Sequence, residues 1–266
     1  MPIDINMSLG HWPFRKLAVT DAAGLVALMD GHGIQQALVA NLEGVLYKDV
    51  MPANEALAIQ VARYRERLIP QAVINPAFPG WERDLRTCAG DLGFRAVRLY
   101  PNYHGYALGD ACFEELLAAA EAAVLAATGD LGLVVSVNVR MTDERMHHWR
   151  VMVPATDLTP LPALAAPHER VPIIVNCANN NEVWALAEGI RSCRNVFVEI
   201  SHIEGPGVVA DLVELIGVER VLFGSHAPYF YADSPRLKLD EAGIAGEQRG
   251  MIEEGNARLV LGLTAA

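Results

Sequence analysis

Residues 171–201 read VPIIVNCANNNEVWALAEGIRSCRNVFVEIS and contain the pattern that decides the fold. Two apolar runs, Pro172–Asn176 and Val196–Ile200, have the length and the β-branched content of buried strands. A helical pattern over Glu182–Arg191 separates them, and Asn181 stands at its start as a candidate cap. A strand, a helix and a second strand in this order predict two parallel strands joined by a crossover helix.

The same alternation of apolar runs and helical patterns extends over the whole chain. Six further strands are predicted at Ile3–Asn6, Gln36–Asn41, Ile69–Asn75, Phe94–Tyr100, Leu133–Val139 and Arg220–Gly224. Further helices are predicted at Asp21–Asp30, Asn54–Arg67, Cys112–Ala127, Val208–Ile216 and Gly246–Leu261. Eight strands followed by helical patterns in 266 residues predict a (β/α)8 TIM barrel that forms a single domain over residues 1–266.

A doubly wound open sheet is the alternative fold. Such a sheet usually carries a glycine-rich phosphate-binding turn after its first strand. The turn here reads SLGHWPFR over residues 8–15, which contains no GxGxxG motif, so the barrel is favoured. We expect the two long irregular stretches, Val151–His168 and Ala227–Gly246, to be loops around the mouth of the barrel.

Composition and charge argue against several classes of function. Hydrophobic residues make up 52% of the chain and charged residues 20%, which is too apolar for a disordered protein. The 21 Lys and Arg residues against 32 Asp and Glu residues give a net charge of −11. This excess argues against nucleic acid and anionic membranes as partners. A small anionic substrate remains open, because a few arginines in one pocket can outweigh a diffuse surface charge.

The N-terminus and the cysteines bear on the cellular compartment. The first residues, MPIDINMSLG, lack the basic and apolar regions of a secretory signal. The most apolar stretch, Leu116–Ala127, is too short to span a bilayer. The cysteines at 88, 112, 177 and 193 form no CxxC pair, so we expect reduced thiols. These features predict a cytoplasmic protein.

Side-chain alternation along the strands separates an apolar face from a polar one. In the first strand it places Ile3 and Ile5 on one face and Asp4, Asn6 and Ser8 on the other. Because helices cover the outside of a barrel, we expect the polar set to face inward. That set comprises Asp4, Asn6, Arg98, Asn138, Arg140, Asn176, Glu199 and His226. A structural barrel would fill these positions with Val, Ile and Leu, so the polar lining predicts a site at the C-terminal mouth.

A purely structural network is the alternative for part of this set. In that interpretation Arg98 pairs with Asp4 or Glu199 and contributes only to stability. Unpaired burial of such groups costs about 1–3 kcal/mol each, so either explanation requires partners for them.

Four segments together resemble the amidohydrolase superfamily, in particular the amidohydrolase-related branch of metal-dependent hydrolases and aromatic-acid decarboxylases. These segments are IDINMSLG (3–10), GFRAVRLYPNYHGYAL (93–108), RVLFGSHAPYF (220–230) and MIEEGNARLVLGL (251–263). The resemblance covers essentially the whole chain and implies a TIM barrel with its site at the mouth.

The chain departs from this family at the positions where the resemblance places the metal ligands. Those positions are occupied here by Asn6, Ser8, Asn138, Asn176 (or its neighbour Cys177) and His226. An Asn amide oxygen is a poor ligand for zinc, which prefers imidazole, thiolate or carboxylate. We therefore expect the family's metal site to be absent and the chain to use no cofactor.

The resemblance and the polar lining together suggest roles for the remaining residues. His226 occupies the family's general-base position, and an imidazole of ordinary pKa near 6.5 exchanges protons at neutral pH. Asn6, Asn138 and Asn176 would orient a carbonyl or stabilise an oxyanion, completing the catalytic set. The predicted substrate-binding residues are Arg98, Arg140, His104, His202, Ser8 and Tyr100, with both arginines holding a carboxylate. This assignment predicts metal-independent hydrolysis, or a related lytic step such as decarboxylation, on a small anionic molecule.

Two other functions stay open. The chain could be a non-catalytic barrel that binds a ligand, or a metal-dependent hydrolase with relocated ligands. The relocated site would hold zinc through His11, His104, His202 and His226. We interpret His147 and His148 as a partly exposed helical pair. Homodimerisation is also left open, because related barrels often dimerise.

Overall fold

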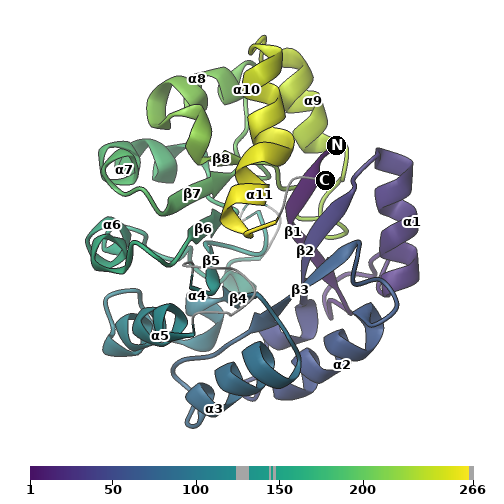
Figure 1. Ribbon diagram of the computed structural model, residues 1–266, viewed down its shortest axis with the longest axis vertical. Coiled ribbons are helices and arrows are strands. Elements are labelled where there is room, and N and C mark those ends of the chain that lie inside the picture. The colour runs from purple at the N-terminus through teal and green to yellow at the C-terminus, as the bar shows by residue number, and fades with distance from the viewer. Residues whose placement is uncertain (124–131, 144, 146–147, 264–266) are drawn as a thin grey trace.

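The computed structural model describes residues 1–123, 132–143, 145 and 148–263. Eight parallel strands pair in sequence order (Figure 1). They are β1 (Ile3–Leu9), β2 (Gln36–Asn41), β3 (Leu68–Val73), β4 (Ala96–Leu99), β5 (Val134–Asn138), β6 (Ile173–Asn176), β7 (Val196–Glu199) and β8 (Val221–Leu222). The Ile5 N–H donates to Phe223 O at 3.0 Å and the Ser8 N–H to Ala227 O at 2.9 Å, so the chain after β8 joins β1. The predicted (β/α)8 barrel is confirmed.

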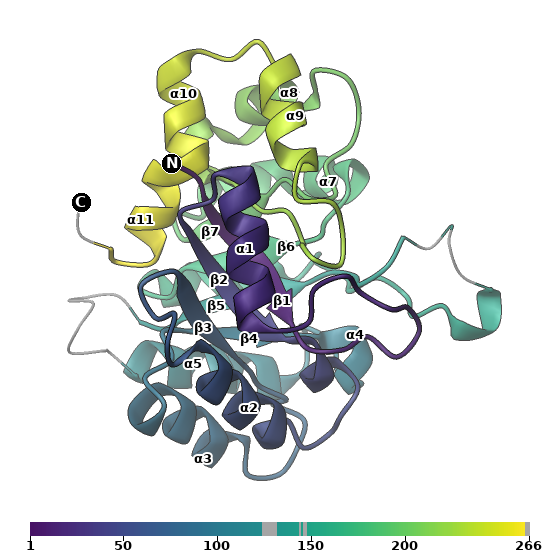
Figure 2. The same ribbon diagram turned by 90° about the vertical axis from the view of Figure 1, so that its right-hand side faces the viewer.

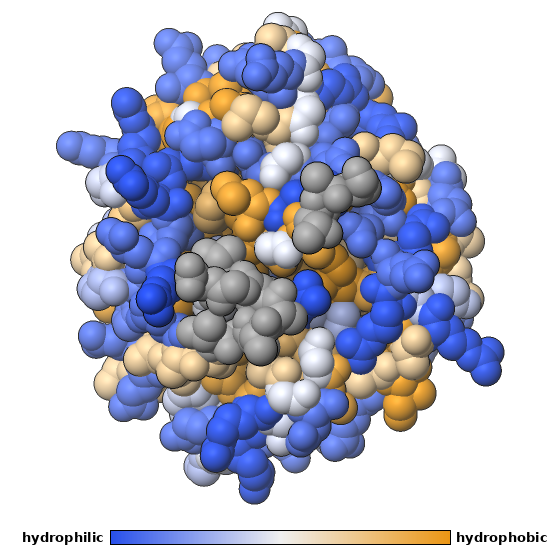
Figure 3. Space-filling model, viewed as in Figure 1, coloured by the Kyte–Doolittle hydropathy of each residue, from blue (hydrophilic) through white to orange (hydrophobic). Residues whose placement is uncertain are grey.

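Helices surround this barrel in Figures 1 and 2. They are α1 (Ala22–His32), α2 (Met51–Val61), α3 (Trp81–Arg86), α4 (Pro101–His104), α5 (Ala111–Ala122), α6 (Leu161–Ala165), α7 (Asn180–Ser192), α8 (Val208–Ile216), α9 (Ser234–Glu241), α10 (Gly246–Gly250) and α11 (Asn256–Val260). Apolar side chains of α1, α2, α3, α5, α6, α7, α8 and α9 pack on the outward residues of the strands in one large core. Figure 3 shows hydrophilic side chains along most of the outline of the molecule. Among the described residues no helix is long and apolar enough to cross a membrane.

Several helix boundaries differ from those predicted, for local reasons. Asn54 does not begin α2, because its side chain bonds both the N–H and the carbonyl of Val73 at 2.8 Å. The cap of α7 is Asn179 rather than Asn181, in a capping box with Glu182. The end of the predicted helix Cys112–Ala127 and His147 lie outside the described residues, and His148 is exposed.

The two stretches predicted to be loops each contain a helix, so those predictions were wrong. Within Val151–His168, helix α6 buries Leu161 and Ala165. Within Ala227–Gly246, helix α9 begins next to Pro235 and buries Leu239. Each helix buries only two apolar residues, so neither stretch carries a hydrophobic period that sequence analysis could detect.

The interior of the barrel begins with an apolar layer to which every strand contributes. It consists of Ile3, Ile5, Leu38, Ile69, Ala96, Val134, Ile174, Phe197 and Leu222, packed on Ala257, Val260 and Leu261 from α11 and the residue after it. Side chains from all eight strands can meet in one cluster only inside the barrel, so Ile3 and Ile5 face inward. Sequence analysis placed them on the face opposite the inward polar set, and that prediction was wrong. The register of β1 against β2 shifts between Asp4 and Met7, as in a β-bulge, which interrupts the simple alternation.

Candidate functional site

The polar side chains predicted to line the barrel are all buried above this apolar layer. They are Asp4, Asn6, Ser8, Arg98, Asn138, Arg140, Asn176, Glu199 and His226. Strand register places Asn138 beside Asn176 and Arg98 beside Ser136. Most of these residues stand at or just past the carboxyl ends of their strands, which is where barrel enzymes carry their active sites.

Glu199, at the end of β7, is the hub of the hydrogen-bond network. Its Oε1 accepts from Asn6 Nδ2 at 3.0 Å, from the Cys177 backbone N–H at 2.6 Å and from Ser201 Oγ at 2.6 Å. Its Oε2 accepts from the Ser201 backbone N–H at 2.5 Å. The carboxylate thus ties together the ends of β1, β6 and β7, with every donor drawn from a neutral group.

Arg98, in β4, is a fully buried cation with weak partners. Its Nη1 lies 3.5 Å from Ser8 Oγ and its Nη2 lies 3.4 Å from Ile5 O, while its Nε has no partner among the described residues. Within the described part of the chain it forms no ion pair, so the structural alternative, in which Asp4 or Glu199 neutralises it, is not observed. Arg98 lines neither of the pockets described below, and its predicted role in substrate binding stays a prediction.

Other buried polar atoms in this region have no partner among the described residues. They include Asn6 Oδ1, Asn176 Oδ1 and Nδ2, His202 Nε2, His226 Nδ1 and the Tyr100 hydroxyl. Unpaired buried polar atoms are rare in folded proteins and cluster where a ligand or water completes the site. The C-terminal end of the barrel interior therefore contains donors and acceptors that a ligand or water could bind.

His226 follows β8 in a strained, closed environment. Its φ of 58° is in the left-handed region, as is that of Cys177 at 59° after β6. The ring is buried, its Nε2 lies 3.3 Å from Met141 O, and Tyr229 and Phe230 cover it with ring centroids 5.0 and 5.2 Å away. Burial, and next the charge of Arg98, lower the pKa of His226 to about 3. The expected pKa near 6.5 does not hold in this environment, and its role as general base stays a prediction.

Aromatic side chains close the mouth above His226. Trp12, from the loop after β1, packs edge-on against Tyr229 with ring centroids 5.4 Å apart. The Arg15 guanidinium lies 4.5 Å from the centre of the Tyr229 ring and also bonds the Tyr229 carbonyl. This cover separates the buried amides and His226 from the open pockets.

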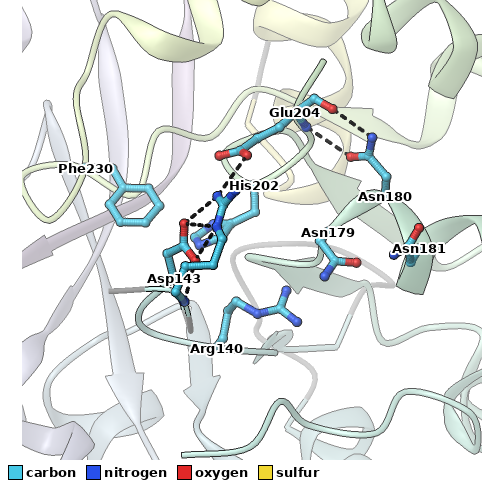
Figure 4. Close-up of a pocket in the computed structure, with 9 residues that line it drawn as sticks. Arg140, Asp143, Asn179, Asn180, Asn181, His202, Glu204 and Phe230 are labelled. Carbon is cyan, nitrogen blue, oxygen red and sulfur yellow. Dashed lines mark hydrogen bonds and ion pairs between the residues drawn. The ribbon is translucent and has the colours of Figure 1, made fainter. Parts of the chain in front are cut away.

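A pocket of about 400 Å³ opens beside this cover (Figure 4). Its lining consists of Arg140, Asp143, Arg145, Asn179, Asn180, Asn181, His202, Glu204 and Phe230. Of the predicted site residues only Arg140 and His202 line it. Figure 4 shows both near Asp143, with Phe230 on one side and the three asparagines on the other.

The two cations of this pocket already have acidic partners. Both Nη atoms of Arg140 pair with the Glu182 carboxylate, and Nη1 also donates to Cys177 O at 3.0 Å. Arg145 pairs through Nε and Nη2 with Asp143, while its side chain stays 75% exposed. The first arrangement fixes Arg140 in place, whereas the exposed Arg145 can turn towards an incoming anion.

His202, just after β7, is the histidine in the lining of the pocket. It is 7% exposed, its Nδ1 lies 3.2 Å from Ser201 Oγ, and its Nε2 has no partner among the described residues. Burial, followed by the charges of His226, Arg140 and Lys238, lowers its pKa to about 2. The ring is therefore neutral near pH 7.

Sequence analysis missed most of the pocket lining. Asp143, Arg145, Glu204 and Phe230 lie beyond strand ends, where no period marks them. The run Asn179–Asn181 directly after β6 was the one available signal, since short polar runs there lie at the mouth of a barrel. The predicted Ser8, Tyr100, Asn6, Asn138 and Asn176 are buried beneath and do not line this pocket.

The structure does not bring together the four histidines of the alternative zinc site. His11 is exposed and lies 3.4 Å from Glu43, and His104, in α4, bonds Gly44 O through Nε2 at 3.0 Å. Only His202 and His226 adjoin, with ring centroids 5.9 Å apart. Across the described residues, no three His, Cys, Asp or Glu side chains converge as a metal site would require.

The sequence matches the family described as Amidohydrolase over residues 14–263. The chain belongs to the amidohydrolase family. This membership confirms the resemblance to the family, and three of the four segments (93–108, 220–230 and 251–263) lie within the matched residues. No protein of curated function matches the sequence.

Solved structures with the same fold include three decarboxylases. A 2,6-dihydroxybenzoate decarboxylase complexed with 2,6-dihydroxybenzoate has 17% identity and a TM-score of 0.77, covering 99% of both chains. The 5-carboxyvanillate decarboxylase of Sphingomonas paucimobilis has 17% identity and a TM-score of 0.76, again covering 99% of both. A dihydroxybenzoic acid decarboxylase of Polaromonas sp. JS666, with bound manganese and 2-nitroresorcinol, has 16% identity and a TM-score of 0.74, covering 100% of this chain and 98% of that one.

The expectation that the chain uses no cofactor is contradicted by these comparisons. Several structures of this fold were determined with bound manganese. The side chains at the five positions that the resemblance assigned to metal ligands do not fit such an ion. Four of them are amides or a hydroxyl, and none is the carboxylate that manganese favours. No residue of this chain is therefore assigned to a metal.

Proposed function

We propose that the protein binds a small carboxylate-bearing aromatic molecule in the pocket of Figure 4 and acts on it as a carboxy-lyase. The observation that carries the proposal is the convergence of Arg145, His202 and Phe230 on that pocket. Arg145 supplies an exposed cation for a carboxylate, Phe230 an apolar face for a ring, and His202 an unpartnered nitrogen.

The choice between hydrolysis and a lytic step rests on the similar solved structures. Three of them are decarboxylases of aromatic acids, and one was determined with its aromatic carboxylate bound. This favours the lytic reaction over the hydrolysis first expected. Arg145 pairs with Asp143 through Nε and Nη2, and its Nη2 also lies 3.5 Å from Glu204 Oε2. A ligand carboxylate would have to replace these partners, and the 75% exposed Arg145 side chain can turn towards it.

Binding and turnover of 2,6-dihydroxybenzoate test the proposal. Affinity is measured by calorimetry, and turnover by release of carbon dioxide, each with and without added Mn²⁺. Arg145→Ala should weaken binding at least tenfold through loss of the charge-assisted hydrogen bonds. Arg150→Ala is the matched control, because Arg150 is exposed on the same segment and lies outside the pocket lining. Equal affinities of the two variants would show that the ligand carboxylate does not bind Arg145 in this pocket.

A non-catalytic binding barrel is the second candidate. The observation that favours it is the set of side chains at the five positions that the resemblance assigned to metal ligands, because these side chains do not suit a metal. The described residues also contain no cluster of three or more His, Cys, Asp or Glu that could hold one. Tight binding with no turnover under either metal condition would support it. Turnover of the bound acid would exclude it.

A further inference from the structure

We propose that His202 presents its Nε2 to the pocket as a fixed hydrogen-bond acceptor, held in that tautomer by Ser201 and Glu199. The pocket therefore selects a ligand that offers an O–H or N–H donor at this point. The tautomer follows from this chain's own contacts, and only the ligand preference rests on the function proposed above.

The direction of the hydrogen bonds follows from the groups around Glu199. Backbone N–H groups of Cys177 and Ser201 can only donate, so the Glu199 carboxylate accepts from both. Ser201 Oγ lies 2.6 Å from Oε1 of the same carboxylate. A second acceptor near this hydroxyl, Cys177 Sγ, is 3.8 Å away and is weaker than a carboxylate oxygen. The single hydroxyl proton of Ser201 is therefore directed at Glu199.

This leaves the lone pairs of Ser201 Oγ to face His202. Its Nδ1 lies 3.2 Å from that oxygen, so the bond requires the proton on Nδ1. In the neutral ring, a proton on Nδ1 leaves a lone pair on Nε2. The sequence of bonds from Glu199 through Ser201 to His202 thus makes Nε2 an acceptor.

The surroundings hold His202 in this orientation. Lys238, in α9, donates through Nζ to the carbonyls of Ile200 and Ser201 at 2.8 Å each, which anchors the segment that carries the ring. The Phe230 ring packs on His202 with centroids 4.6 Å apart. An alternative partner for the free nitrogen is absent from the described residues. His202 lines the pocket and is 7% exposed as a residue, and its Nε2 is a buried atom with no partner in the described part of the chain. Leaving this lone pair unpaired has a free-energy cost that a ligand donor would remove.

Long-range ¹H–¹⁵N NMR of the imidazole nitrogens at pH 7 tests the tautomer, with His202 assigned through His202→Gln. We expect the Nδ1–H tautomer in the wild type. Ser201→Ala should shift the ring towards a mixture of tautomers, whereas Ser201→Thr keeps the hydroxyl and should restore the wild-type signals. Ser192→Ala is the control, because that hydroxyl bonds Gly189 O on the exposed side of α7. An Nε2–H tautomer in the wild type, or unchanged signals in Ser201→Ala, would overturn the proposal.

A pair of ligands tests the selection. We expect 3-hydroxybenzoate to bind the wild type about tenfold more tightly than benzoate, and this preference to shrink in Ser201→Ala but not in Ser192→Ala. Equal affinities of the two acids for the wild type would show that the pocket does not select a donor. If neither acid binds, the function proposed above fails, while the NMR result still decides the state of His202.

Discussion

The rings of His202 and Phe230 stack at the mouth of the barrel, with centroids 4.6 Å apart and planes 33° from parallel. Phe230 also packs edge-on against His226, with centroids 5.2 Å apart. One aromatic side chain therefore covers two of the three histidines that sequence analysis placed in the site, His202 and His226. It also forms a wall between the pocket of Figure 4 and a larger hollow of about 890 Å³, because it lines both.

This position predicts how a change at Phe230 affects binding. Phe230→Ala should merge the two hollows and weaken binding of an aromatic acid by about tenfold, the scale of one lost aromatic contact. Phe230→Tyr should keep the ring and most of the affinity. Calorimetric titration with 2,6-dihydroxybenzoate distinguishes the two variants, and equal affinity in wild type and Phe230→Ala would contradict a ligand-binding role for the ring.

Replacement of Glu199 should lower the free energy of unfolding by a large amount. Replacing it by Ala leaves Asn6 Nδ2 and the N–H groups of Cys177 and Ser201 without their acceptor in the buried network. At about 1–3 kcal/mol for each unsatisfied group, with partial relaxation, we expect a loss of about 3–5 kcal/mol in the free energy of unfolding. Urea denaturation measures it. Glu204→Ala, at an exposed carboxylate, should change the value by less than about 0.5 kcal/mol.

These sites show which features sequence analysis could predict and which it could not. The barrel was predictable because each strand is a short apolar run with a clear boundary. The inward position of Asn138, Asn176 and Glu199 followed from the period of two along such runs. Ile3 and Ile5 were assigned to the wrong face because a bulge in β1 changes that period, and no residue type in the strand marks the shift.

The pocket was less predictable than the barrel for a physical reason. Its lining is contributed mainly by segments beyond the strands, whose conformation depends on tertiary contacts rather than on local patterns. Asp143 and Phe230 are examples, since they meet only because the chains after β5 and β8 converge at the mouth. The low pKa of His226 was equally inaccessible, because it depends on burial under Tyr229 and Phe230.

The raised pKa of Asp4 predicts that the free energy of unfolding depends on pH. Burial raises its pKa from 3.8 to about 6, although the N–H groups of Asn6 and Ser225 bond its Oδ1. A raised acid pKa means that the folded state binds the proton more tightly than the unfolded state. The contribution is favourable below pH 4 and is lost as the pH rises to about 6, amounting to about 3 kcal/mol.

Asp4→Asn isolates this contribution because the amide keeps an oxygen for the two N–H donors and cannot ionise. We expect the variant to gain stability over the wild type between pH 4 and 6 and to keep a constant advantage above that range. Urea denaturation at pH 4, 5, 6 and 8 measures the difference. A difference that does not change with pH would show that Asp4 titrates normally in the folded protein.

The lowered pKa of His226 predicts a pH dependence of stability opposite in sign to that of Asp4. Its pKa is lowered from 6.5 to about 3, so below pH 6.5 the unfolded chain takes up a proton that the folded protein refuses. This group therefore destabilises the fold as the pH falls from 6.5 to 3, by up to about 5 kcal/mol at the lower end.

His226→Asn removes this titration with little disturbance of the backbone. Asn tolerates the left-handed φ of 58° better than other non-glycine residues, and its amide can still donate towards Met141 O. We expect the variant to resemble the wild type at pH 8 and to lose less stability on acidification to pH 5. Parallel urea titrations at the two pH values measure both proteins. Equal losses would mean that the His226 ring is accessible to solvent protons, and the aromatic cover of Tyr229 and Phe230 would then be open in solution.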